Sequence, residues 1–81
     1  MRKPTFFERI MYHYDRKKKS DFSIGYVQAL EDNNRVRNHL NKVVYPKRIK
    51  EYSAKKRLTD EEKGLLSIAK GYRACISDLD K

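Results

Sequence analysis

The chain has 81 residues, 38% of them hydrophobic and 38% charged, and its 20 Lys and Arg against 11 Asp and Glu give a formal charge of +9. This length allows one domain, residues 1–81, with a lean core, and three Gly and two Pro are too few for a low-complexity disordered chain. A single cysteine excludes an internal disulfide, and the lack of a signal-peptide core or of an apolar run of about 20 residues predicts a cytoplasmic protein without a membrane span.

The first predicted helix covers about residues 4–17. Pro4 and Thr5 lie where a helix can begin, and Glu8 follows in the first turn, where an acidic side chain is favourable. Apolar side chains then recur at three- and four-residue spacing, which is typical of one helical face: Phe6, Phe7, Ile10, Met11 and Tyr14. The basic residues 16–19 come at the predicted C-terminal end, where cations suit the helix dipole.

The second predicted helix begins after Ser20 or Asp21 as the N-cap. Its apolar face continues through two groups of side chains, first Phe22, Tyr26, Val27 and Leu30, then Val36, Leu40, Val43 and Val44. Between them, Asn33 and Asn34 compete with helical hydrogen bonds, so the chain either breaks there or continues as one helix to residue 44. The single long helix is preferred because neither Gly nor Pro forces an earlier stop, and Pro46 is expected to end it.

Two further helices are predicted after Pro46. Residues 46–58 form a short, strongly basic helix with a narrow inward face of Ile49, Tyr52, Ser53 and Leu58. Thr59 and Glu62 then form a capping box, which starts a helix over residues 59–79. Its apolar stripe is broad and has helical period: Leu65, Leu66, Ile68, Ala69, Tyr72, Cys75, Ile76 and Leu79. Gly64 and Gly71 lie on one face, where they are either simply tolerated or allow another backbone to approach closely.

These segments predict an all-α fold, a small single-domain bundle of three to four helices, with no strand and no internal repeat. The charge divides the bundle unevenly. Residues 1–58 hold sixteen Lys and Arg against six Asp and Glu, a net of +10, whereas residues 59–81 hold four against five, a net of −1. The last helix is therefore expected to be a structural strut, and the basic part to make contact with an anionic partner.

The candidate contact residues for nucleic acid or another anionic partner form two clusters: Arg16, Lys17, Lys18 and Lys19, then Lys47, Arg48, Lys50, Lys55, Lys56 and Arg57. Cations that surround a helix suit sequence-independent phosphate contact, because Lys and Arg release the counterions condensed on a polyanion. Tyr45 and Tyr52 lie between these cations, where they either stack on unpaired bases or belong to the edge of the core.

A helix-turn-helix over residues 23–44 is an alternative route to DNA, with Asn33 and Asn34 in the turn. It fits that motif poorly. The position in the first helix that is usually taken by a small residue falls on the large Leu30; if Ala29 is placed there instead, the residues that follow fall out of register with the motif. Its second helix would present side chains that are able to contact a groove: Arg35, Arg37, Asn38, His39 and Lys42.

Catalytic and cofactor motifs are not found, so neither an enzyme nor a bound cofactor is expected. His13 and His39 lack metal-ligand spacing, Cys75 lacks a CxxC partner, and no phosphate-binding glycine loop is present. Contact with a membrane surface is also not expected, since the basic helix of residues 46–58 has Ile49 and Tyr52 where such helices usually carry Trp, Phe or Leu.

The stretch DRKKKSDFSIGYVQALED, residues 15–32, is similar to small accessory proteins of phages and mobile elements. This resemblance covers about a quarter of the chain and implies a protein that binds and blocks, or redirects, a host or defence protein. Two hypotheses follow: a non-enzymatic module that contacts nucleic acid, and a protein inhibitor or adaptor whose basic face docks on an acidic protein surface. Binding to a nucleoprotein complex satisfies both. The broad stripe of the last helix also leaves room for a homodimer.

Overall fold

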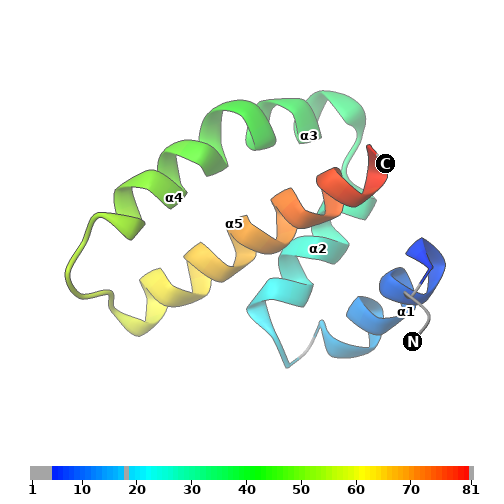
Figure 1. Ribbon diagram of the computed structural model, residues 1–81, viewed down its shortest axis with the longest axis horizontal. Helices are drawn as coiled ribbons and strands as arrows, with labels where there is room; N and C mark the ends of the chain where they lie inside the picture. The colour runs from blue at the N-terminus through cyan, green and yellow to red at the C-terminus, as the bar shows by residue number, and fades with distance from the viewer. Residues whose placement is uncertain (1–4, 18, 81) are drawn as a thin grey trace.

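The computed structural model describes residues 5–17 and 19–80, and in this part of the chain all regular structure is helical. The elements follow in the order α1 (Phe6–Arg16), α2 (Asp21–Glu31), α3 (Asn34–His39), the π-helical turn η1 (Leu40–Val44), α4 (Tyr45–Ser53) and α5 (Asp60–Leu79). Figure 1 shows that α3, η1 and α4 continue one another as a single rod, residues 34–53, which lies alongside α5. The predicted all-α bundle of three to four helices is confirmed.

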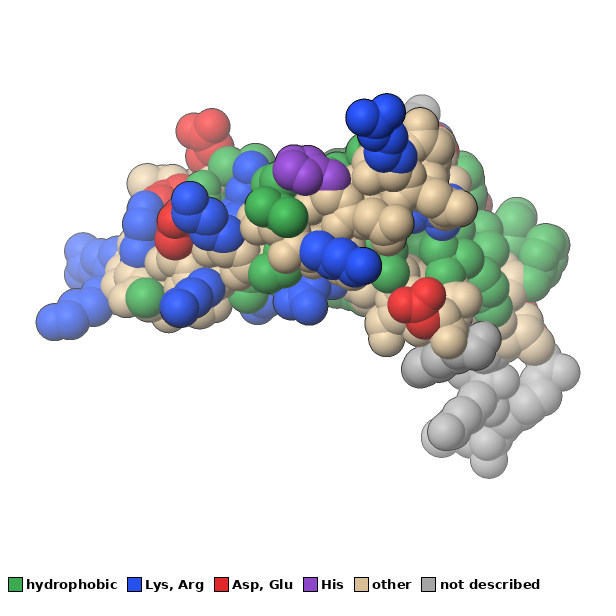
Figure 2. Space-filling model, turned by 90° about the horizontal axis from the view of Figure 1, so that it is seen from above, with side chains coloured by type: hydrophobic (Ala, Val, Ile, Leu, Met, Phe, Trp, Pro, Cys, Tyr) green, Lys and Arg blue, Asp and Glu red, His purple; other side chains and the backbone are tan. Residues whose placement is uncertain are grey.

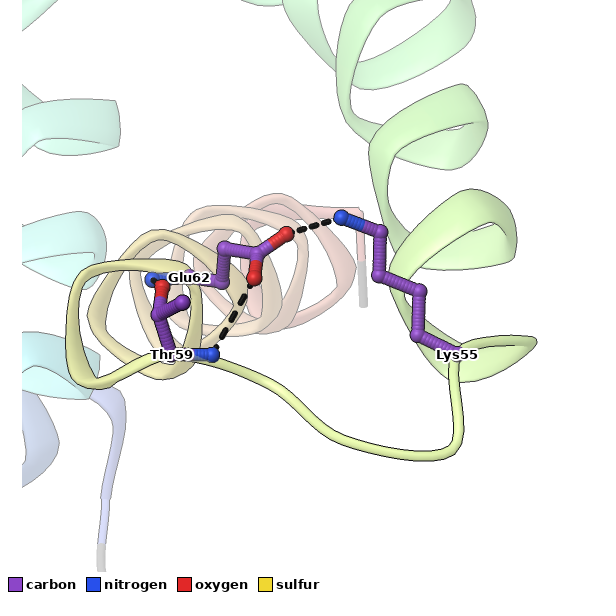
Figure 3. A network of polar contacts seen from close by, with 3 residues as sticks. All are labelled: Lys55, Thr59 and Glu62. Atoms are coloured by element: carbon purple, nitrogen blue, oxygen red, sulfur yellow. Dashed lines mark hydrogen bonds and ion pairs between the residues drawn. The ribbon is translucent and has the colours of Figure 1, made fainter.

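The helix starts follow the capping signals in the sequence. The hydroxyl of Thr5 accepts a 3.2 Å bond from the backbone N–H of Glu8, and α1 begins at Phe6. At α5 the predicted capping box is present, with Thr59 Oγ1 accepting from the N–H of Glu62 at 3.1 Å and Glu62 Oε1 accepting from the N–H of Thr59 at 3.1 Å. Figure 3 shows that the second carboxylate oxygen of Glu62 also pairs with Lys55, which ties the end of α4 to the start of α5.

The preferred single helix from residue 21 to residue 44 is wrong. Ser20 is the N-cap of α2, as predicted, but α2 ends at Glu31. Asp32 and Asn33 are both extended, and the side chain of Asn33 accepts a 3.0 Å bond from the N–H of Val36, which starts α3. The side chain of Asn33 thus competes with the backbone for a helical N–H, and here this capping bond breaks the helix without Gly or Pro.

Pro46 lies in the first turn of α4, as a helix starting near residue 46 predicts, but it does not interrupt the rod as expected, because the chain stays helical through Tyr45. In an α-helix the proline ring would clash with the carbonyl four residues earlier, and its missing N–H would break the bonding pattern. The rod avoids this clash through the π-helical turn η1 directly before Pro46, where the N–H of Tyr45 donates to the carbonyl of Leu40, five residues back. The wider turn accommodates the proline, and Tyr45 keeps helical dihedral angles.

The core lies where α2 crosses α5, and two glycines let these helices approach to backbone contact. A Cβ placed on Gly71 would lie 1.9 Å from the carbonyl oxygen of Phe22, and one on Gly25 would lie 2.0 Å from that of Ile68. Of the two alternatives left open for Gly64 and Gly71, close approach of another backbone therefore holds at Gly71, and that backbone belongs to α2. Gly64 differs, since a Cβ there would lie 3.0 Å from a side-chain oxygen of Asp21.

The two core helices carry a short repeat that the sequence analysis missed. The pattern is a Gly-Tyr pair followed by an aspartate six residues after the tyrosine. It occurs in α2 and its C-cap as Gly25, Tyr26 and Asp32, and in α5 as Gly71, Tyr72 and Asp78. Each tyrosine donates to the aspartate from the other segment: Tyr26 to Asp78 at 2.7 Å and Tyr72 to Asp32 at 2.6 Å. Each copy spans eight residues and the two are identical at only three positions, which is too little to stand out in the sequence.

Helix α1 packs on α2 through polar and aromatic contacts, and none of its described residues is fully buried. The ring of His13 stacks on Tyr26 with centroids 4.0 Å apart, and its Nδ1 shares a 2.9 Å hydrogen bond with the buried hydroxyl of Ser23. Arg9 adds a 2.8 Å ion pair with Asp78. Within residues 5–17 and 19–80, no helix combines the length and the apolar character needed to cross a bilayer.

Candidate nucleic-acid interface

The positive charge of the chain is concentrated on the rod and on the loop that follows it. Residues 34–57 hold nine Lys and Arg and a single acidic residue, Glu51, a net of +8 out of the total of +9. Figure 2 views this side of the molecule from above and shows Lys and Arg side chains along the rod and at the end where α4 leads to α5. The inward residues of the rod, Leu40, Val44, Tyr45 and Ile49, pack against the core.

The second predicted cluster is only partly helical. Lys47 and Lys50 are exposed on α4, and the Arg48 guanidinium lies 5.3 Å from the centre of the Tyr45 ring. Lys55, Lys56 and Arg57 lie in the basic loop, residues 54–59, and not on a helix as predicted. Helix α4 ends at Ser53, and the basic loop leads the chain back to Thr59, whose capping box starts α5.

The first predicted cluster lies apart from the second. Arg16 ends α1, Lys17 is its C-cap, Lys19 lies in the link to α2, and Lys18 falls outside the described residues. The Lys17 ammonium lies 5.3 Å from the centre of the Tyr14 ring. Figure 1 places α1 and the rod on opposite sides of the α2–α5 pair, so the structure does not join the two clusters into one surface.

The two tyrosines predicted to stack on bases have different environments. Tyr45 is 8% exposed, its ring centre lies 4.9 Å from that of Tyr72, and burial raises the pKa of its hydroxyl. A buried ring has little face left for a base, so the structure favours the core alternative for Tyr45 over the stacking role. Tyr52 is half-buried under the Lys55 ammonium, 5.2 Å from its ring centre, and its stacking role stays a prediction.

A groove between the rod and the C-terminal half of α5, lined by both polar and apolar side chains, was not foreseen. Two adjoining hollows of about 590 and 240 Å³ form it, and both are lined by Ile76 and Asp80. The rod contributes Asn34, Arg37, Asn38, Asn41 and Ile49, and α5 with its C-cap contributes Lys70, Arg73, Ala74, Ile76, Ser77, Leu79 and Asp80. We call this the amide groove, because three asparagines line its rod side.

The spacing of these residues was a usable signal. Asn34, Asn38 and Asn41 recur at four- and three-residue intervals, which places them on one side of a helix. The helix-turn-helix alternative had named Arg37 and Asn38 but expected them on a freely exposed recognition helix. In the structure α3 has six residues, and both side chains line the groove against α5.

The Ser23–His13 pair does not form a catalytic site. Burial, with a contribution from Arg16, lowers the pKa of His13, and Asp78 opposes this shift. Ser23 is 2% exposed, however, and a nucleophile must reach its substrate. The Cys75 thiol is also buried, which raises its pKa to about 11. In the part of the chain that the structure describes, no three His, Cys, Asp or Glu side chains are grouped as metal ligands.

Comparison with protein-family models, with curated proteins and with solved structures gave no match to this chain.

Proposed function

We propose that the protein is a non-enzymatic nucleic-acid-binding module that holds the phosphate backbone with the rod and the basic loop. The observation that carries the proposal is the ratio of nine cations to one acid over residues 34–57. Six of these cations lie on the rod, whose inward side chains pack against the core, and three lie in the basic loop that follows it, so most of them are placed to face a polyanion.

The length of the rod supports several simultaneous contacts. A helix over residues 34–53 is about 30 Å long at 1.5 Å per residue. A duplex of the same length carries about eighteen phosphates. Exposed lysines and arginines along the rod and in the loop therefore face a matching row of charges, and each contact releases condensed counterions.

Salt dependence tests this proposal directly. Binding of generic duplex and single-stranded DNA and RNA is measured at about 50 and 200 mM salt, where six phosphate contacts predict a loss of affinity of about a thousandfold. Lys47→Glu is expected to weaken binding and to reduce the salt slope. Lys63→Glu on α5 makes the same change of net charge outside the rod and is the matched control. No detectable binding at the lower salt would contradict the proposal.

A second candidate is a protein inhibitor or adaptor whose basic face docks on an acidic surface of a host or defence protein. The observation that favours it is a shallow hollow of about 460 Å³ on the rod, lined by Val43, Val44, Lys47, Arg48, Glu51 and Tyr52. Val43 is 56% exposed there. An exposed apolar side chain among cations suits an acidic protein segment better than a phosphate backbone.

Val43→Ser separates the two candidates. It is expected to weaken capture of an acidic protein partner and to leave duplex affinity unchanged, since a phosphate gains little from a valine.

The homodimer remains a prediction without support from Gly71, because α2 covers that glycine. Light scattering at high protein concentration measures it, and a monomer would dispose of it.

A further inference from the structure

We propose that the amide groove holds a single-stranded stretch of nucleic acid and contacts the edges of its unpaired bases. This inference rests on the proposed function and adds to it the kind of nucleic acid and the place of base contact. It assigns different tasks to two surfaces, with phosphates on the rod and the basic loop, and bases between the rod and α5.

The composition of the groove differs from that of the outer rod. Asn34, Asn38 and Asn41 supply three amides, and Asp80 places a carboxylate among them. A carboxylate repels phosphate but accepts hydrogen bonds from base amino groups, and an asparagine amide can donate to and accept from the same base. A strip made only for phosphate would not include Asp80, whereas a site for base edges can use all four side chains.

The apolar lining of the amide groove and the cations on its α5 side also fit a single strand of nucleic acid. Ile49, Ala74 and Ile76 give the groove an apolar lining against which the flat face of a base can lie. Lys70 and Arg73 project from the same stretch of α5, three residues apart, so they share one side of that helix. They can hold the phosphates on either side of a base whose edge meets the asparagines.

Arg37 provides an independent sign of a missing partner. It lines the groove beside Asn38, and its Nε is buried without a hydrogen-bond acceptor among residues 5–17 and 19–80. Buried polar groups are nearly always paired, and an exception calls for a cause. A small shift of the Arg37 side chain would present this Nε to an acceptor that a ligand brings into this end of the groove, such as a base oxygen or a ring nitrogen.

The shape of the groove favours single strands over duplex. Asn34, Asn38 and Asn41 line hollows between the rod and α5, so an unpaired base that enters them can reach their amides. A duplex keeps its Watson–Crick edges paired and must instead be entered by a protruding element. The two hollows, about 590 and 240 Å³, fall around the size of small-molecule sites, which suits one or two unpaired nucleotides.

The test uses fluorescence anisotropy with single-stranded DNA homopolymers of about twelve nucleotides and with a duplex hairpin of mixed sequence. Asn38→Ala is expected to weaken binding of the preferred homopolymer about fivefold or more and to reduce the differences between homopolymers. The duplex affinity and the salt slope should not change. Arg37→Gln and Arg35→Gln form a matched pair on α3, and only the first should reproduce the loss for single strands.

The outcomes distinguish the two proposals. Equal binding of duplex and single strands, unchanged in Asn38→Ala, overturns the groove assignment and leaves phosphate binding by the rod intact. Absence of any nucleic-acid binding overturns both. If poly-glutamate displaces a bound single strand from the wild-type protein and itself loses affinity in Asn38→Ala, the groove belongs to an acidic peptide and the inference falls.

Discussion

The hydroxyl of Tyr26 on α2 donates a 2.7 Å hydrogen bond to Oδ2 of Asp78 on α5. The 2.6 Å bond from Tyr72 to Asp32 repeats this contact with the two helices exchanged. Around them, Gly25 lies against Ile68 and Gly71 against Phe22, so the crossing of α2 and α5 has an approximate local two-fold symmetry. Burial first, and then the bond to aspartate, raises the pKa of each tyrosine, so both hydroxyls stay protonated donors at neutral pH.

Tyr26→Phe is expected to destabilise the protein, because it removes a donor from a carboxylate in a part-buried site. A hydrogen bond to a charged group contributes about 1.5–3 kcal/mol, and the ion pair that Asp78 keeps with Arg9 should reduce the loss to about 1–2 kcal/mol. For a domain of this size, each kcal/mol lowers Tm by about 4–8 °C in a thermal scan. Tyr12→Phe is the control, since Tyr12 is 54% exposed, and its Tm should hardly change.

Tyr72→Phe should give a loss of similar size, because its bond to Asp32 has the same geometry and Gln28 also donates to that carboxylate at 2.8 Å. If neither phenylalanine variant changes Tm, the crossing is held by packing alone.

Gly71→Ala is expected to destabilise the protein, although alanine is the better helix former by about 1 kcal/mol. Its methyl group would lie 1.9 Å from the Phe22 carbonyl oxygen, so the two helix backbones would have to separate. Overpacking of this kind costs about 1–3 kcal/mol and would appear as a lower midpoint in urea unfolding.

Gly64→Ala is the matched control on the same helix. The new methyl group would meet only the carboxylate of Asp21, an exposed side chain that can turn away. The gain in helix propensity should therefore leave stability unchanged or raise it by up to about 1 kcal/mol. Equal destabilisation by both variants would mean that the backbone contact at Gly71 is not what limits the substitution.

The sequence predicted what local signals determine and missed what depends on packing. The capping box at Thr59 is complete within four residues, so the start of α5 could be read directly. The end of α2 depended on whether Asn33 would cap a new helix, and the same residues allow either outcome. The passage of the rod through Pro46 depended on a π turn, for which no local sequence rule was available. The amide groove required knowing that the rod lies beside α5, which is a tertiary fact.

His13 is expected to make stability depend on pH below neutrality. Burial, with a smaller effect of Arg16, lowers its pKa in the folded protein from the ordinary 6.5, against the opposing influence of Asp78. The neutral imidazole is therefore the form that the fold favours. Its contribution is fully present above about pH 6.5 and is lost as the pH falls through the lower pKa of the folded state.

Nuclear magnetic resonance titration of the His13 ring should give a midpoint below 6.5. In urea unfolding between pH 7.5 and 5, the wild-type protein should lose more stability than His13→Gln, because only the wild type must bury or expel a protonated ring. A His13 midpoint above 6.5 would show that the attraction of Asp78 outweighs burial.

Tyr45→Ala should act on stability, and Tyr52→Ala on binding. Tyr45 is 8% exposed and packs on Tyr72, so removal of its ring leaves a cavity in a small core and is expected to cost about 3–5 kcal/mol. Tyr52 is half-buried at the edge of the rod, so its truncation should cost less and should weaken single-strand affinity if a base stacks on it. Thermal unfolding and anisotropy, measured on both variants, separate the two effects. A folded Tyr45→Ala protein with unchanged Tm and weakened single-strand binding would support the stacking role over the core role.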